Sequence, residues 1–142
     1  GPNDCYDLKK NHVIPALIKK IHEAKIKNLK SISLWGTGNA LREFLYVEDM
    51  ADGIIHIMEN YNEPSPINLG TGEEITIKNL SIIIKNVIGY KGKINFDSSK
   101  PEGVKRKILN NSKVKKLKWS PKFSLENGLE ITYQNYLKEL SK

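Results

Sequence analysis

Four residues in the first third of the chain have side chains that could bind an anionic substrate and act on it. His12 carries an imidazole, which ordinarily titrates near neutral pH and can donate a proton to a reacting carbon. Lys20 and Arg42 carry cations that could contact a phosphate, and Trp35 offers an aromatic face on which a base could stack. The basic residues 105–107 are either a further anion clamp or a solvated run. These residue types suit a phosphorylated or nucleotide-linked small molecule.

His12 and Lys20 need a helix to hold them, and residues 12–25 have the pattern of one. Leu17 and Ile21 belong to an apolar stripe that recurs at helical spacing. Pro15 falls in the first turn, where a missing N–H is tolerated. Such a helix places Lys20 roughly 12 Å along its axis from His12. The simpler interpretation, which spacing alone favours, is that His12 merely starts the helix and that Lys20 belongs to a solvated face.

Trp35 and Arg42 would be presented by short extended segments. Residues 31–35 alternate between polar and apolar side chains, as a half-buried strand does. Residues 36–40 form a glycine-containing turn, and residues 42–47 are expected to be extended again. A core tryptophan and a surface arginine are the alternative, which spacing does not distinguish from a binding site.

A helix is expected to begin at Glu48 and Asp49, because acidic residues favour the positive end of the helix dipole. Gly53 inside this helix indicates close packing against a neighbouring element. Its buried stripe is expected to be Met50, Ile54, Ile57 and Met58.

The rest of the chain continues the alternation of helix and strand patterns. Strands are expected over residues 66–70 and 93–97, and a short helix over residues 112–117. Thr76 is expected to cap a helix that ends at Gly89, and Ser124 to cap the last helix. The inward face of that last helix is expected to be Leu125, Leu129, Tyr133, Tyr136, Leu137 and Leu140. This order predicts an α/β fold in which some helices would cover a sheet outside the chain.

Several kinds of site are disfavoured by the sequence. The segments at residues 36–38 and 70–72 are both Gly-Thr-Gly, but the third glycine of a dinucleotide fingerprint is absent, so both are expected to be tight turns. The histidines are dispersed, so no metal site is expected. The chain also lacks the Gly-x-Ser-x-Gly element of acyl transfer.

Composition indicates a folded protein with an anionic partner. The 142 residues are 39% hydrophobic and 27% charged, with a formal charge of +7, and no apolar run is long enough to span a membrane. No secretory signal is seen, and the single cysteine, Cys5, suits a reducing compartment, so a cytoplasmic location is expected. Nucleic acid is disfavoured as a partner because no nucleic-acid-binding motif is present.

Taken together, the motifs closely resemble those of GDP-L-fucose synthases, which are extended short-chain dehydrogenases/reductases. That family epimerises and reduces GDP-4-keto-6-deoxy-mannose with NADPH. The resemblance covers essentially the whole chain, and two segments, "HVIPAL" at residues 12–17 and "SKPEG" at residues 99–103, point to this branch. The shared segments are residues 1–4, 11–17, 35–38, 42–51, 67–72, 99–103 and 106–107.

The resemblance implies a role for individual residues. His12 matches the histidine acid that protonates the sugar ring carbon during epimerisation, and it also matches a position that contacts the cofactor. The positions that hold the GDP-sugar correspond to Val13, Lys20, Trp35, Arg42 and Lys107. Residues 1–142 would then be one unit, the C-terminal substrate-binding portion of an extended short-chain dehydrogenase/reductase, lacking most of the Rossmann sheet.

The family's glycine-rich loop, its Ser/Tyr/Lys reduction site and its catalytic cysteine match nothing in this chain. NADPH would accordingly be bound mainly by an N-terminal half. A truncated or split gene, a partial sequence, or a fragment that works with a separate N-terminal half would each account for this, and the complete enzyme is expected to be a homodimer. The alternatives are part of a GDP-heptose or other nucleotide-sugar epimerase, and a non-catalytic remnant that still binds nucleotide-sugar.

Overall fold

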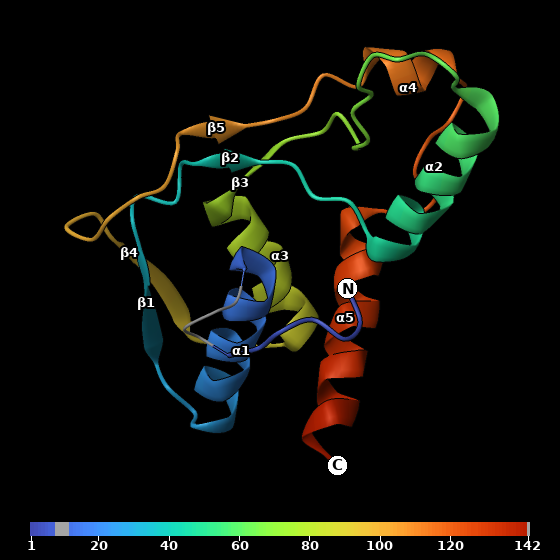
Figure 1. The fold of residues 1–142 in the computed structure, drawn as a ribbon. Helices are drawn as coiled ribbons and strands as arrows, with labels where there is room; N and C mark the ends of the chain where they lie inside the picture. Colours follow the sequence, from blue (N-terminus) through green and yellow to red (C-terminus); the bar gives the residue numbers. More distant parts are fainter. Residues whose placement is uncertain (8–11, 142) are drawn as a thin grey trace.

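The computed structural model describes residues 1–7 and 12–141, so Asn11, the first residue of one shared segment, lies outside the described residues. None of the described helices is long and apolar enough to cross a membrane. In chain order the elements are α1 (Val13–Ile26), β1 (Ser31–Trp35), β2 (Leu41–Arg42), α2 (Val47–Asn60), β3 (Ile75–Thr76), α3 (Ile77–Ile88), β4 (Lys93–Asp97), β5 (Arg106–Lys107), α4 (Ser112–Lys116) and α5 (Leu125–Leu140) (Figure 1).

The strands form two small sheets beside the helices. β1 and β4 pair in parallel, with Trp35 opposite Asp97 at the end of the ladder. The second sheet has the order β3-β2-β5, with β2 antiparallel to β3 and parallel to β5. In its register Arg42 lies opposite Lys107, so two residues that are distant in the sequence become neighbours.

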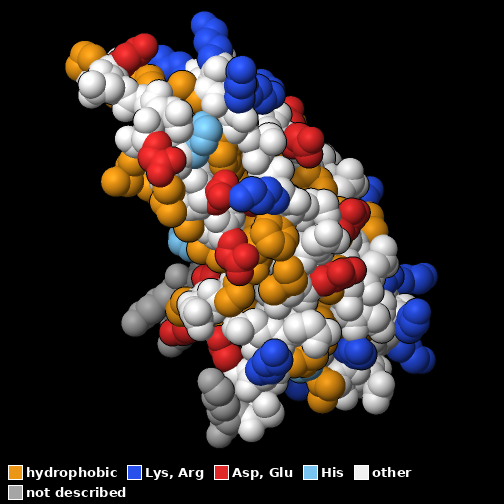
Figure 2. Space-filling view, turned by 90° about the vertical axis from the view of Figure 1, so that its right-hand side faces the viewer, with side chains coloured by type: hydrophobic (Ala, Val, Ile, Leu, Met, Phe, Trp, Pro, Cys, Tyr) orange, Lys and Arg blue, Asp and Glu red, His pale blue; other side chains and the backbone are white. Residues whose placement is uncertain are grey.

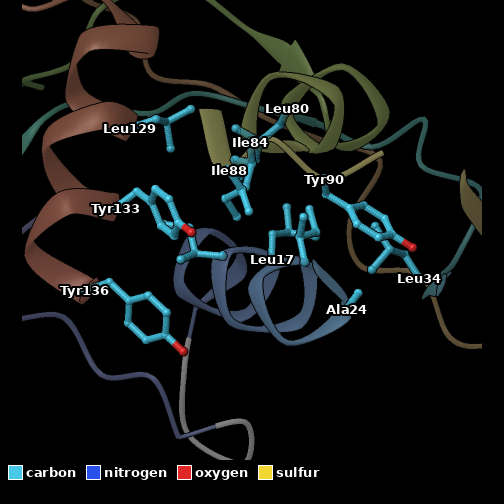
Figure 3. Packing of buried hydrophobic residues seen from close by; sticks show 12 residues of the cluster. Leu17, Ala24, Leu34, Leu80, Ile84, Ile88, Tyr90, Leu129, Tyr133 and Tyr136 are labelled. Atoms are coloured by element: carbon cyan, nitrogen blue, oxygen red, sulfur yellow. The ribbon is translucent and has the colours of Figure 1, made fainter. Parts of the chain in front are cut away.

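Helices α1, α3 and α5 enclose the core, as Figure 3 shows. On α3, Leu80, Ile84 and Ile88 follow one another at intervals of four, which aligns them on a single face of the helix. Tyr133 and Tyr136 of α5 point toward the same core. The packing fixes the direction of α1 and therefore the positions of the candidate site residues at its start and along its length.

The helix boundaries confirm the local signals in the sequence. Thr76 Oγ1 accepts a hydrogen bond from the backbone N–H of Asn79 at 3.1 Å, and Ser124 Oγ accepts one from the backbone N–H of Asn127 at 3.2 Å. Gly89 ends α3 with φ 74°, in the left-handed region that glycine adopts without strain. These caps are predictable from the sequence because each cap residue interacts only with backbone groups a few residues away.

Helix α2 packs against later segments of the chain through Gly53 and Asp49. At Gly53 an added Cβ would lie 2.7 Å from the Leu69 side chain and 2.9 Å from Trp119, which confirms the expected close packing. The buried Asp49 carboxylate accepts hydrogen bonds from the backbone N–H groups of Lys122 at 2.9 Å and Phe123 at 3.1 Å. These contacts tie α2 to the segment before α5.

The expected buried stripe of α2 is wrong for this chain. Met50 and Ile54 are exposed, the latter at 48%, and Met58 is 77% exposed, while Ile57 is only half-buried. Figure 2 shows hydrophobic side chains on the upper part of this face, where α2 lies. The helix is amphipathic as expected, but the described residues leave most of its apolar face uncovered.

Two further expectations are corrected. Residues 66–70 pair with no described strand and are not a strand themselves. Of the segment expected to be extended at 42–47, only Arg42 belongs to a strand, β2, and Val47 already begins α2. Leu140 is exposed, because it lines an open concave region at the end of α5. The other inward positions expected on α5 do contact the core.

Candidate binding site for a nucleotide-linked substrate

The start of α1 presents His12 to solvent. His12 is the N-cap residue, and its carbonyl oxygen accepts a hydrogen bond from the backbone N–H of Ala16 at 3.1 Å. Its side chain makes no capping hydrogen bond and is exposed, so the imidazole is accessible to a ligand. Val13 follows as the first helical residue and is half-buried, while Pro15 is buried in the first turn.

Lys20 and Trp35 form the first pair of candidate residues that the structure brings together. Lys20 Nζ lies 5.9 Å from the centroid of the Trp35 ring, which is within the range of a cation–π contact. The indole is 64% exposed at the end of β1. The expectation of a core tryptophan is therefore excluded, and an aromatic face with a cation beside it is open to a ligand.

Arg42 and Lys107 form the second pair. They are register partners on parallel strands, so their Cα atoms are about 4.8 Å apart and their side chains project from the same face of the sheet. Arg42 Nη1 donates to the Leu41 carbonyl oxygen at 2.7 Å, and Lys107 is exposed. Within the described part of the chain, neither residue is paired with a carboxylate. Two cations held side by side in this way favour an anion such as a diphosphate.

The segment at Glu102 and Gly103 links the two pairs. The Thr37 hydroxyl donates to the Glu102 carboxylate at 2.8 Å, and an added Cβ at Gly36, next to Trp35, would lie 3.3 Å from the Glu102 side chain. An added Cβ at Gly103 would lie 3.2 Å from Arg42 Nη2. One short segment therefore lies next to both pairs, and we treat the two pairs together as the candidate binding surface.

His12 is not joined to this surface by any contact that the described residues make. A cleft of about 550 Å³ lies between the segment around Tyr46 and the start of α5, and Ile14 lines it, so the first turn of α1 borders this cleft. A second cleft of about 650 Å³ lies between α1 and the end of α5. None of the candidate site residues lines either of these two clefts.

The two Gly-Thr-Gly segments are tight turns, as the sequence predicts. An added Cβ at Gly38 would lie 2.6 Å from the Phe96 ring, so this glycine makes room for a protein side chain. The backbone N–H of Gly72 donates to the Glu43 carboxylate at 2.6 Å. Because protein atoms occupy both turns, neither fits the pyrophosphate of a dinucleotide cofactor.

The sequence analysis missed Glu43, which directly follows Arg42. Besides Gly72, its carboxylate accepts hydrogen bonds from the backbone N–H of Leu109 at 2.9 Å and from Asn111 Nδ2 at 3.0 Å. A lone acid before the apolar residues 44–47 was the available signal, since such a carboxylate requires partners.

The hydrogen bonds to Glu43 change its pKa. Burial raises the pKa of the Glu43 carboxyl, but hydrogen bonds from Gly72, Leu109, Asn111 and Thr71 outweigh it, and the pKa lies below its usual value. The carboxylate therefore adds stability above the ordinary glutamate pKa, and this contribution is lost as the pH falls through the lower folded value.

A family model and a solved structure both resemble this chain. Residues 1–70 match the family model described as NAD dependent epimerase/dehydratase family. A GDP-6-OMe-4-keto-L-xylo-heptose reductase from C. jejuni superposes with a TM-score of 0.86 at 29% identity, covering 98% of this chain and 51% of that one. The chain therefore has part of the α/β fold of the epimerases and reductases of this class, which confirms the expected fold class.

Other relatives of the chain are named as GDP-L-fucose synthases. The chain is 43% identical over 140 residues to GDP-L-fucose synthase 1 of Arabidopsis thaliana, covering 99% of this chain and 43% of that protein. A GDP-L-fucose synthetase from Naegleria fowleri, in a structure bound to NADP, superposes with a TM-score of 0.90 at 30% identity, covering 100% of this chain and 45% of that one. The chain thus spans about half the length of the relatives it matches. The expected resemblance to the C-terminal half of GDP-L-fucose synthases is confirmed.

Proposed function

We propose that residues 1–142 are one substrate-binding unit of a GDP-L-fucose synthase-like epimerase/reductase, which holds the GDP part of GDP-4-keto-6-deoxy-mannose and presents His12 to its sugar. The observation that carries this proposal is the register that places Arg42 beside Lys107, together with the exposed surface of Trp35. That surface occurs in a chain 43% identical to a GDP-L-fucose synthase.

The side chains of this surface have complementary roles toward GDP. The Arg42 guanidinium is planar and can donate two parallel hydrogen bonds to a phosphate, while Lys107 and Lys20 act as point charges. The exposed indole of Trp35 offers a stacking surface for the base. Val13 adds an apolar contact next to His12.

His12 is the proposed acid for epimerisation. One nitrogen of its imidazole donates a proton to the sugar ring carbon, and exposure at the start of α1 leaves the ring accessible for this step. Helix α1, held by the core, keeps His12 at a fixed distance from Lys20.

Protein atoms fill both Gly-Thr-Gly turns, so neither turn supports binding of the NADP phosphates. NADPH, which the resemblance implies, is therefore assigned mainly to the half of the fold outside this chain, with His12 at its edge. The reduction of the keto group belongs to that half as well.

The exposed apolar face of α2 supports a partner for this unit. Helices of α/β folds bury their apolar faces against a sheet, and Met50, Ile54 and Met58 have no such cover among the described residues. We assign this face to the sheet of an N-terminal half, which would complete the fold. A cytoplasmic homodimer, which the resemblance and the sequence lead us to expect, is the proposed state of the complete protein.

The proposed function is tested by binding and by complementation. The chain is expected to bind GDP in calorimetry, and NADPH-dependent turnover of GDP-4-keto-6-deoxy-mannose is expected only after the N-terminal half of the Arabidopsis relative is added. Binding of GDP without restored turnover would favour the non-catalytic remnant instead. Absence of GDP binding, or nucleic-acid binding with a steep salt dependence, would exclude the proposal.

A second candidate differs in the sugar. The match to the C. jejuni heptose reductase, with a TM-score of 0.86, supports a GDP-heptose substrate. The complemented enzyme should be offered both keto-sugars in competition. Preference for the heptose would transfer the assignment to this second candidate.

The role of His12 predicts a specific defect. In the complemented enzyme, His12→Asn should slow solvent deuterium exchange at the epimerised carbons by about 100-fold or more, because a positioned acid is lost. GDP affinity should stay unchanged. Deuterium uptake measured by mass spectrometry checks the first expectation, and calorimetry the second.

His22, on the same helix, provides the comparison for this substitution. Its Nδ1 lies 3.0 Å from the Tyr133 hydroxyl, so its role is structural. His22→Asn should therefore leave the exchange rate unaltered in protein that remains folded. Equal losses of exchange and of GDP binding in His12→Asn would contradict the assignment of His12 as an acid.

A further inference from the structure

The two strands that carry the cationic pair are very short. β2 and β5 each have two residues, so the ladder between them supplies few hydrogen bonds. Arg42 and Lys107 also repel each other, which opposes the pairing that brings them together. Something besides the ladder must hold the two segments at a fixed spacing.

Beyond the ends of β2 and β5, hydrogen bonds to the Glu43 carboxylate hold the neighbouring segments together. Leu109, two residues after Lys107, donates its backbone N–H to Glu43 Oε2 at 2.9 Å. On the other side of β2, the backbone N–H of Gly72 donates to Oε1 at 2.6 Å. The Glu43 side chain therefore connects the end of β2 to two other segments, the one that follows β5 and the one that precedes β3.

Gly70 leaves space for the Glu43 carboxylate, and Asn111 supplies a hydrogen-bond donor to it. A Cβ at Gly70 would overlap with Glu43 Oε1, so that position accommodates only glycine without a shift. Asn111 is 5% exposed, and its Nδ2 donates to Oε1 at 3.0 Å. A buried amide and a glycine beside the same oxygen indicate a built site for the carboxylate and not a chance surface contact.

We propose that Glu43 is the positioning residue of the cationic pair: its carboxylate fixes the segments after β2 and β5 so that Arg42 and Lys107 meet a diphosphate at a set spacing. This inference rests on the proposed function, because the diphosphate belongs to GDP. Glu43 itself touches no substrate and acts only through its two neighbours.

Glu43→Gln tests the inference with little change in shape. A glutamine offers one oxygen in place of two, so its amide group faces a donor and at least one of the bonds from Gly72, Leu109 or Asn111 is lost. The dissociation constant for GDP, measured by calorimetry on the 142-residue chain, should rise about tenfold.

Asp49→Asn is the matched control. The Asp49 carboxylate also accepts two backbone N–H groups, from Lys122 and Phe123, but it lies on α2 and holds a different segment. This variant should leave the GDP dissociation constant unchanged at a temperature where both variants are folded. Equal weakening in the two variants would show a general loss of stability and would overturn the inference.

A second measurement separates this inference from the proposed function. In NMR spectra without ligand, Glu43→Gln should shift the Arg42 Nε–Hε signal and the Lys107 amide signal, whereas Asp49→Asn should not. Unchanged signals in Glu43→Gln overturn the positioning role, whether or not the chain binds GDP. Failure of the unsubstituted chain to bind GDP, together with shifted signals, would overturn only the proposed function.

Discussion

Replacing Arg42 by alanine should weaken GDP binding by about 10- to 100-fold, the loss expected for charge-assisted hydrogen bonds to a phosphate. Arg42 lies next to Lys107 in the register of β2 and β5, and the lysine alone cannot donate two parallel bonds to one phosphate group. Calorimetry with GDP measures the loss. In the complemented enzyme, deuterium exchange under saturating substrate should change less than affinity.

Arg106 supplies the control for this prediction. It precedes Lys107 on β5, but Glu74 already neutralises it, with Arg106 Nε 2.8 Å from Glu74 Oε2. Arg106→Ala removes the same charge and should leave GDP affinity within about twofold, because successive side chains of a strand point to opposite faces and this exposed ion pair lies on the other face from Lys107. If both variants lost affinity equally, binding would depend on net charge and not on the pair at Arg42.

Replacing Ile54 by aspartate should abolish the recovery of NADPH-dependent turnover with an N-terminal half. Ile54 is 48% exposed on the apolar face of α2, so the change leaves the isolated chain folded. In the complex, the carboxylate would be buried without a partner, which costs several kcal/mol and weakens association by about 100-fold or more. Turnover titrated against the concentration of the N-terminal half measures the effect.

The control for Ile54→Asp is Ile82→Asp, which makes the same substitution on α3, outside the apolar face of α2. Ile82 is 44% exposed, close to the exposure of Ile54, and it lies on a different helix. Turnover should be recovered with this variant as with the unsubstituted chain. Loss of recovery in both variants would mean that added negative charge, and not burial of the α2 face, prevents association.

The sequence predicted those features that depend on neighbouring residues. The ends of α3 and α5 follow from Thr76, Gly89 and Ser124, since each cap bonds to groups a few residues away. The strand at Ser31–Trp35 and the position of α1 follow from periodicity alone. The chemical types of the site residues were visible for the same reason.

Features that depend on distant segments were not predictable in this way. The position of Arg42 opposite Lys107 is set by a strand register, which no local pattern in two-residue strands specifies. Glu43 was missed because its donors, Gly72, Leu109 and Asn111, are far away in the sequence. The exposure of the α2 stripe was mispredicted because periodicity reports an apolar face but not whether its cover lies in the same chain.

The long sequence separation between β2 and β5 has a consequence for how the chain and its ligand depend on each other. The cationic pair exists only after β5 has docked, so partly folded forms in which this strand is detached lack the anion site altogether. A ligand that binds the native form alone shifts the folding equilibrium by mass action. Nucleotide in the surrounding medium would thus help to keep the last strand of this sheet in place.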